Sequence, residues 1–161
     1  MVIFTMYMAI VNVLFVCSGN TCRSPMAVAL LRKKIKERGL VKKIRCDSAG
    51  LYVKESEDMS TFAKLALKEF GVNIIKHQAR QFELPMLKKN KFVFTMSKVY
   101  KDRIYAIEPR AYNVVNLAEY TGGEDVPDPY GGSVENYLEI AKYLDFLMDR
   151  VLNKVIKECN L

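Results

Sequence analysis

The sequence predicts an α/β fold, in which a single domain holds a four-stranded parallel sheet with helices on both faces. A length of 161 residues is typical of one domain, and a hydrophobic content of 50% is sufficient for a buried core. Runs of β-forming residues alternate along the chain with segments of helical hydrophobic spacing. This alternation is typical of a parallel sheet whose strands are connected by helices.

The first strand is predicted at residues 10–16, where an apolar run is typical of a parallel strand buried on both faces. The residues before it are also apolar, but they lack the basic start and the small-residue cleavage site of a signal peptide. The run is slightly short for a membrane span, and Asn12 interrupts it. We therefore expect residues 1–8 to be an N-terminal extension and residues 9–161 to form the domain.

The next elements continue the alternation. A helix is predicted at residues 25–38, because proline suits the first turn of a helix and Gly39 follows the last apolar position. A second strand at residues 43–47 leads into the segment S-A-G. A second helix is predicted at residues 61–70, with Ser60 as its N-cap.

The second half of the chain has the same order of elements. A β-rich run predicts a strand at residues 91–96, and a helix at residues 98–107 ends before Pro109. A fourth strand is predicted at residues 112–117. Apolar residues spaced three and four apart predict a long terminal helix at residues 133–158.

The segment V-C-S-G-N-T-C-R-S-P follows the first predicted strand, at the end where parallel sheets bind ligands. Gly19 and Asn20 accept unusual backbone conformations, so the loop can turn its amide groups inward as an anion-binding nest. Arg23 and the N-terminus of the following helix add positive charge that favours a phosphoryl group. We expect this field to lower the pKa of Cys17, and Ser24 to donate a hydrogen bond to the thiolate. The segment predicts a cysteine nucleophile that attacks phosphorus, and the alternative is a buried cysteine packed at a turn.

The loop after the fourth predicted strand offers a proton donor. Asp128 lies between Pro127 and Pro129, which stiffen the loop, and two glycines follow Tyr130. The loop leaves the same rim of the sheet as the cysteine segment. A leaving group in phosphoryl transfer needs a proton, and we expect Asp128 to donate it. The alternative is an ordinary Asp-Pro turn.

A net charge of +7 indicates an acidic substrate or partner, or else a solvated lysine-rich surface. Basic clusters interleaved with apolar residues favour the solvated surface, and no RNA-binding signature accompanies them. The four cysteines and one histidine lack the paired spacing of a zinc site and do not form the disulfide framework of a secreted protein. We expect a cytoplasmic protein without metal or cofactor that binds neither nucleic acid nor membrane.

Four motifs together resemble the low-molecular-weight protein tyrosine phosphatase family: V-C-S-G-N-T-C-R-S-P, S-A-G at 48–50, H-Q-A-R at 77–80 and D-P-Y-G at 128–131. The resemblance runs from about residue 10 to residue 158 and marks residues 9–161 as a phosphatase domain. It implies that Cys17 forms a phosphocysteine, that Arg23 holds the phosphoryl oxygens, and that Asp128 acts first as acid and then as base. The loop residues expected to bind phosphate or substrate are Ser18, Gly19, Asn20, Thr21, Cys22 and Ser24.

The residue at position 21, a threonine, narrows the range of expected substrates. Tyrosine-specific members of the family usually carry an apolar branched residue here, and a threonine resembles the protein-arginine phosphatase branch. A hydroxyl can interact with polar groups beside a planar guanidinium, whereas a branched alkyl group packs on a phenyl ring; the alternative is that Thr21 only completes the loop. Tyr52 and Tyr130 are expected to form walls of the pocket, because tyrosine stacks on either group. The resemblance implies phosphoarginine proteins as substrates, phosphotyrosine proteins as the alternative, and inorganic phosphate as the product.

The resemblance also implies a redox role for Cys22, which can form a disulfide with Cys17 and protect it from irreversible oxidation. The alternative is that Cys22 only packs. Arsenate reductases share a similar fold and loop but need further cysteines near residues 80–100, and this segment has none. A non-catalytic phosphate-binding module would need neither the nucleophile nor the acid. We expect a monomeric enzyme.

Overall fold

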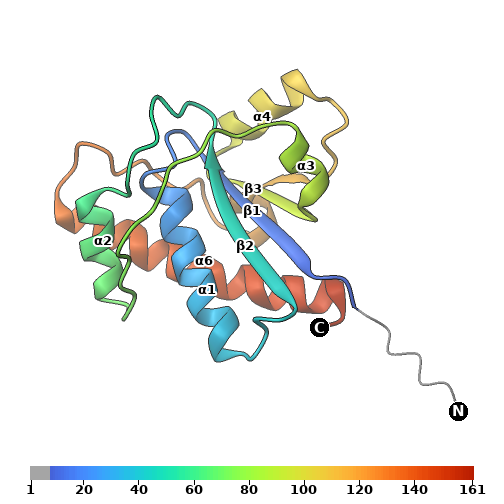
Figure 1. The fold of residues 1–161 in the computed structure, drawn as a ribbon, viewed down its shortest axis with the longest axis horizontal. Helices are drawn as coiled ribbons and strands as arrows, with labels where there is room; N and C mark the ends of the chain where they lie inside the picture. Colours follow the sequence, from blue (N-terminus) through green and yellow to red (C-terminus); the bar gives the residue numbers. More distant parts are fainter. Residues whose placement is uncertain (1–7) are drawn as a thin grey trace, which may run out of the picture.

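Four parallel strands form the centre of the structure, a computed structural model that describes residues 8–161 (Figure 1). The strands are β1 (Val11–Cys17), β2 (Ile44–Gly50), β3 (Phe92–Thr95) and β4 (Val114–Asn116). Their order in the sheet is β2-β1-β3-β4, so the chain reverses its direction of travel across the sheet between β2 and β3. Ligands of such sheets bind where this reversal occurs, at the carboxyl ends of the two central strands. The predicted fold class is confirmed.

Six helices cover the two faces of the sheet within the described part of the chain. They are α1 (Arg23–Glu37), α2 (Thr61–Lys68), α3 (Pro85–Lys89), α4 (Lys98–Ile107), α5 (Leu117–Thr121) and α6 (Val134–Cys159). Figure 1 shows α1, α2 and α6 on one face and α3 and α4 on the other. Among residues 8–161, no helix combines the length and apolar character needed to cross a bilayer.

The core is divided by the sheet, and β1 contributes to both halves. Phe15 packs among the residues of α1 and α6, and its ring lies 5.6 Å from that of Phe94 in β3. Leu14 and Val16 face the other way and pack with Ile104 of α4. All five side chains are fully buried. A strand covered on both faces shows a continuous apolar run, which is why the sequence signal for β1 is clear.

The boundaries of the predicted elements agree with the structure to within a few residues. The helix at residues 98–107 is confirmed without change, whereas the fourth strand is shorter than predicted and β2 extends through the S-A-G segment. Ser60 is the N-cap of α2, but its side chain makes no capping hydrogen bond. The short helices α3 and α5 were not predicted, because five residues are too few for a periodic pattern. The expected extension at residues 1–8 lies, apart from Met8, outside the described residues.

The carboxyl ends of the central strands bring distant loops together. Cys17 at the end of β1 is aligned with Gly50 at the end of β2. The amide of Val126 donates to the carbonyl of Met96, just beyond β3, at 2.9 Å, which ties the loop containing Asp128 to the same rim. Gly50 permits this closeness, because a Cβ atom there would lie 2.5 Å from the carbonyl oxygen of Ser18.

Candidate active site

The segment from Cys17 to Ser24, called here the cysteine loop, connects β1 to α1. Four of its carbonyl groups accept hydrogen bonds from outside the loop, at distances of 2.8 to 3.0 Å. The acceptors are the carbonyls of Cys17, Ser18, Asn20 and Thr21; the donors are the amides of Leu51, Tyr52 and Ser60, and Nε2 of His77. In a trans peptide the carbonyl and the following amide point in opposite directions. The amides of the residues that follow these carbonyls are therefore turned toward the interior of the loop, as in an anion-binding nest.

Asn20 holds the shape of the cysteine loop. It is fully buried and has a φ of 57°, the left-handed conformation expected from its residue type. Its side-chain oxygen accepts from the amide of Arg80 at 3.0 Å, and its side-chain nitrogen donates to Ser24 Oγ at 2.8 Å. Its carbonyl oxygen lies 2.8 Å from His77 Nε2, which therefore carries the proton. The H-Q-A-R motif thus supports the loop through two contacts with Asn20, one from the ring of His77 and one from the amide of Arg80.

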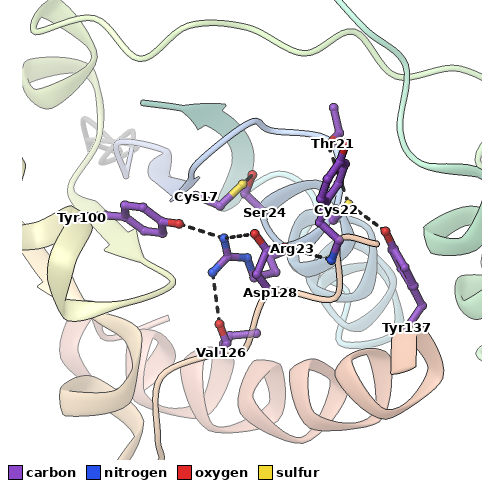
Figure 2. A network of polar contacts seen from close by, with 10 residues as sticks. Cys17, Thr21, Cys22, Arg23, Ser24, Tyr100, Val126, Asp128 and Tyr137 are labelled. Carbon is purple, nitrogen blue, oxygen red and sulfur yellow. Dashed lines mark hydrogen bonds and ion pairs between the residues drawn. The ribbon is translucent and has the colours of Figure 1, made fainter. Parts of the chain in front are cut away.

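Cys17 and Ser24 face each other at the base of the loop, as Figure 2 shows. Their Sγ and Oγ atoms are 2.9 Å apart. Because Ser24 Oγ already accepts from Asn20, its own proton is available to the cysteine sulfur. The predicted contact between Ser24 and the sulfur is confirmed.

Burial has the largest effect on the pKa of Cys17. It raises the pKa of the thiol above its ordinary value, against the lowering effects of the Ser24 hydrogen bonds, the Arg23 charge and the Asn20 amide. The direction is opposite to the one expected from the sequence. The sequence indicates the positive groups around the sulfur but does not show that the thiol is 2% exposed.

Arg23 is fixed by three partners from two parts of the chain, α4 and the loop that contains Asp128 (Figure 2). Its side chain is only 5% exposed. Nη1 donates to the carbonyl of Val126 at 3.1 Å, and Nη2 donates to the hydroxyl of Tyr100 at 2.9 Å. The carboxylate of Asp128 lies 3.3 Å from Nη2 and is half exposed. The structure thus brings together three residues of the sequence prediction, Cys17, Arg23 and Asp128, in one pocket.

The pocket has a volume of about 300 Å³. Nine of the predicted residues line it: Cys17, Ser18, Gly19, Thr21, Cys22, Arg23, Tyr52, Asp128 and Tyr130. The other two, Asn20 and Ser24, are fully buried and are not among the lining residues. The hydroxyl of Tyr52 receives a hydrogen bond from Arg103 of α4, whose guanidinium carbon also lies 4.9 Å from the ring centre. Tyr52 is therefore held in place, whereas Tyr130 is 82% exposed.

Thr21 and Cys22 occupy the side of the loop nearest α6. Thr21 lines the pocket, and its hydroxyl lies 3.7 Å from the sulfur of Cys22. The Cys22 sulfur also lies 3.5 Å from the hydroxyl of Tyr137 (Figure 2). Burial and this contact raise the pKa of Tyr137 to about 12, so its hydroxyl is protonated at neutral pH.

Several residues of the pocket were not identified from the sequence. Lys54, Glu55 and Glu57 line its wall, and Tyr100 and Val126 hold Arg23. The charged run K-E-S-E-D begins four residues after the end of β2, so its nearness to the rim of the sheet could have been inferred from the sequence. Nothing in the sequence indicates the roles of Tyr100 and Val126, which depend on how α4 and the Asp128 loop pack.

A parallel sheet with a cysteine-containing anion cradle at its carboxyl end, and a carboxylate facing that cradle, defines a class of protein that includes cysteine-dependent phosphatases. Comparison with known proteins identifies the family. The family model "Low molecular weight phosphotyrosine protein phosphatase" matches residues 12–161. The chain belongs to this family and is a low-molecular-weight protein phosphatase.

Individual relatives agree with this assignment. A protein-arginine-phosphatase of Geobacillus stearothermophilus is 35% identical over 150 residues, covering 91% of this chain and 97% of the relative. A low molecular weight protein tyrosine phosphatase of T. tengcongensis has a similar structure, with a TM-score of 0.84, 36% identity and coverage of 89% and 99%. The structure of the YwlE arginine phosphatase, as a Cys-to-Ser mutant with a phosphorylated active site serine, gives a TM-score of 0.85, 30% identity and coverage of 91% and 96%.

Proposed function

We propose that the protein hydrolyses phosphoarginine in proteins through a phosphocysteine on Cys17. The observation that carries the proposal is the placement of the Cys17 sulfur in a loop whose amides are turned inward, with Arg23 and Asp128 in the same pocket. A phosphorylated serine in the corresponding mutant of the YwlE arginine phosphatase supports a covalent intermediate at this position.

In the first step the thiolate of Cys17 attacks phosphorus, and the bond between phosphorus and the leaving group breaks. The inward amides and Arg23 carry the negative charge of the phosphoryl oxygens. Asp128 donates its proton to the leaving nitrogen or oxygen. The Ser24 hydroxyl, 2.9 Å from the sulfur, stabilises the thiolate before the attack.

In the second step water attacks the phosphocysteine. Asp128, now ionised, takes a proton from the water as the new oxygen–phosphorus bond forms. The sulfur–phosphorus bond breaks, Cys17 leaves as the thiolate, and inorganic phosphate is released. The same contacts from Ser24 and Arg23 stabilise the departing thiolate. Asp128 thus carries out the proton transfer in both of these steps.

Thr21 favours phosphoarginine over phosphotyrosine, because this residue lines the pocket and carries a hydroxyl in place of a branched alkyl group. The name of the Geobacillus relative supports the same substrate. A guanidinium leaving group also depends strongly on a proton donor, and Asp128 provides one beside Arg23. Tyr52, held by Arg103, gives the planar group a surface to stack on. We expect a monomer that acts on phosphorylated proteins in the cytoplasm.

The second candidate substrate is phosphotyrosine, which is favoured by the likeness to a protein tyrosine phosphatase of T. tengcongensis. The deciding experiment measures kcat/KM on one carrier protein that bears either phosphoarginine or phosphotyrosine, with Cys17→Ser as the inactive control. A higher value for phosphoarginine is expected. A higher value for phosphotyrosine would assign the enzyme to that substrate, and turnover by Cys17→Ser would contradict the nucleophile.

A further inference from the structure

Two carboxylates lie in the wall of the pocket without a cationic partner. Glu55 and Glu57 line the cavity that contains Cys17, and both side chains are exposed. Neither residue takes part in an ion pair within residues 8–161. We call this pair of carboxylates the acidic mouth.

The acidic mouth contrasts in sign with the chain as a whole, which carries a net charge of +7. The wall of the pocket contains two cations, Arg23 and Lys54. Arg23 is buried and paired with Asp128, so Lys54 is the only exposed cation among the described residues of the wall. Carboxylates repel a phosphoryl group, and the pair therefore contributes nothing favourable to binding the phosphate itself.

The backbone holds the acidic mouth over the cysteine loop. The segment between β2 and α2 is tied to the loop at both ends, where the amides of Tyr52 and Ser60 each donate at 2.9 Å to loop carbonyls. Between these anchors, the carbonyl of Glu57 accepts from the amide of Ala79 at 2.8 Å, and the Glu57 amide donates to the Glu55 carbonyl at 2.9 Å. The two carboxylates are thus attached to a fixed support.

We propose that the acidic mouth selects substrates by the charge around the phosphorylated residue, so that the enzyme acts preferentially on phosphorylated residues flanked by lysine or arginine. The inference rests on the proposed phosphatase function of this pocket. Glu55 and Glu57 attract the flanking cations, while the cradle binds the phosphoryl group. Exposed charges interact within about 10 Å at 0.1 M salt, a distance that covers the neighbouring side chains of a bound peptide.

The test uses three peptides with the same phosphorylated residue, either phosphoarginine or phosphotyrosine, whichever the enzyme hydrolyses faster. The peptides differ only in their flanking residues, which are lysine, serine or aspartate. Values of kcat/KM are measured at low and high salt for the unmodified enzyme and for the Glu55→Gln/Glu57→Gln double variant. Glu69→Gln, which removes an exposed carboxylate outside the pocket, is the matched control.

At low salt we expect the unmodified enzyme to favour the lysine peptide over the aspartate peptide about tenfold, and less at high salt. The double variant should reduce this ratio to about twofold, and Glu69→Gln should leave it near tenfold. With p-nitrophenyl phosphate, which has no flanking residues, the double variant should be about twofold faster, since repulsion of the phosphate is relieved.

An equal rate on the lysine and aspartate peptides, or an unchanged ratio in the double variant, would overturn the selection by the acidic mouth. A different result would show that the protein is not a phosphatase at this pocket. The unmodified enzyme would then be as inactive as Cys17→Ser on all three peptides and on p-nitrophenyl phosphate.

Discussion

The carboxylate of Asp128 and the guanidinium of Arg23 form an ion pair within the pocket, with Oδ2 and Nη2 3.3 Å apart. The proposed acid therefore lies beside the cation that is proposed to hold the phosphoryl oxygens. A bound phosphoryl group competes with Asp128 for this cation, which frees the carboxyl group to face the leaving group. The half-exposed position of Asp128 leaves it room to make that movement.

Replacement of Asp128 by asparagine should affect substrates whose leaving group needs a proton more than substrates whose leaving group departs as a stable anion. Without a proton donor, kcat should fall about 100-fold or more on phenyl phosphate or phosphoarginine, whose leaving groups need a proton. The loss on p-nitrophenyl phosphate should be much smaller, because p-nitrophenolate leaves readily as an anion. Asp102→Asn, which removes an exposed carboxylate paired with Lys98, is the control. Equal losses on both kinds of substrate would contradict the role of Asp128 as an acid.

Tyr100 should act through Arg23. Tyr100→Phe keeps the ring and removes the hydroxyl that accepts from Nη2 at 2.9 Å, so we expect kcat/KM to fall about tenfold and inorganic phosphate to inhibit less strongly. Tyr105→Phe is a matched control from the same helix, since its hydroxyl donates to the carbonyl of Val114 at 3.0 Å, away from the pocket. If phosphate inhibits both variants equally, Tyr100 does not position Arg23.

Thr21→Ile tests the basis of substrate choice. An isoleucine removes the hydroxyl and offers an alkyl group to the pocket, so the ratio of phosphotyrosine to phosphoarginine hydrolysis should rise about tenfold. The ratio of the two kcat/KM values measures this effect independently of protein concentration. A ratio that stays constant would place the discrimination on other residues of the wall.

The raised pKa of Cys17 makes a prediction about pH. A group whose pKa is raised is protonated over more of the neutral range, so alkylation of Cys17 by iodoacetamide should be slow near pH 7. The rate should still be rising where an ordinary thiol, with a pKa of about 8.5, has begun to level off. Ser24→Ala removes hydrogen bonding that lowers the pKa, so its alkylation should be slower still at each pH. Both rates are measured by mass spectrometry of the Cys17 peptide, and a plateau below pH 7 would show that the thiolate is favoured instead.

Cys22 should make oxidation reversible. Peroxide converts the Cys17 thiolate to a sulfenic acid, and attack by the Cys22 sulfur forms a disulfide with release of water. Activity should then return with a thiol reductant in the unmodified enzyme and should be lost permanently in Cys22→Ser. The Cys22 sulfur must first leave the hydroxyl of Tyr137, now 3.5 Å away. If the Cys22→Ser variant regained the same fraction of its activity, Cys22 would not be the residue that protects Cys17.

The fold was predictable because its main elements carry strong periodic signals. The apolar run of β1 and the helical spacing of α6 are each long enough to indicate their type and approximate ends. Helices α3 and α5 are formed by tertiary packing over little more than one turn each, and such segments have no periodicity of their own.

The residues of the candidate site could be predicted where they are close together in the sequence or are flanked by residues typical of turns. Cys17, Arg23 and Ser24 share one loop, and Asp128 is marked by its flanking prolines. Tyr100 could not be found, because its contact with Arg23 depends on the packing of α4 against the end of α1. The direction of the Cys17 pKa shift was wrong for a related reason: a list of neighbouring charges does not reveal how fully the sulfur is removed from water.

Gly50 takes no part in the chemistry, yet its missing side chain preserves the orientation of the cradle. A Cβ atom there would meet the carbonyl oxygen of Ser18 at 2.5 Å and the amide nitrogen of Asn20 at 2.9 Å. Even alanine would push on the peptide groups whose inward amides are proposed to bind the phosphoryl group, because backbone atoms cannot yield as a flexible side chain can. Any side chain at position 50 would therefore disturb the loop without touching the nucleophile, so steric exclusion alone requires glycine here.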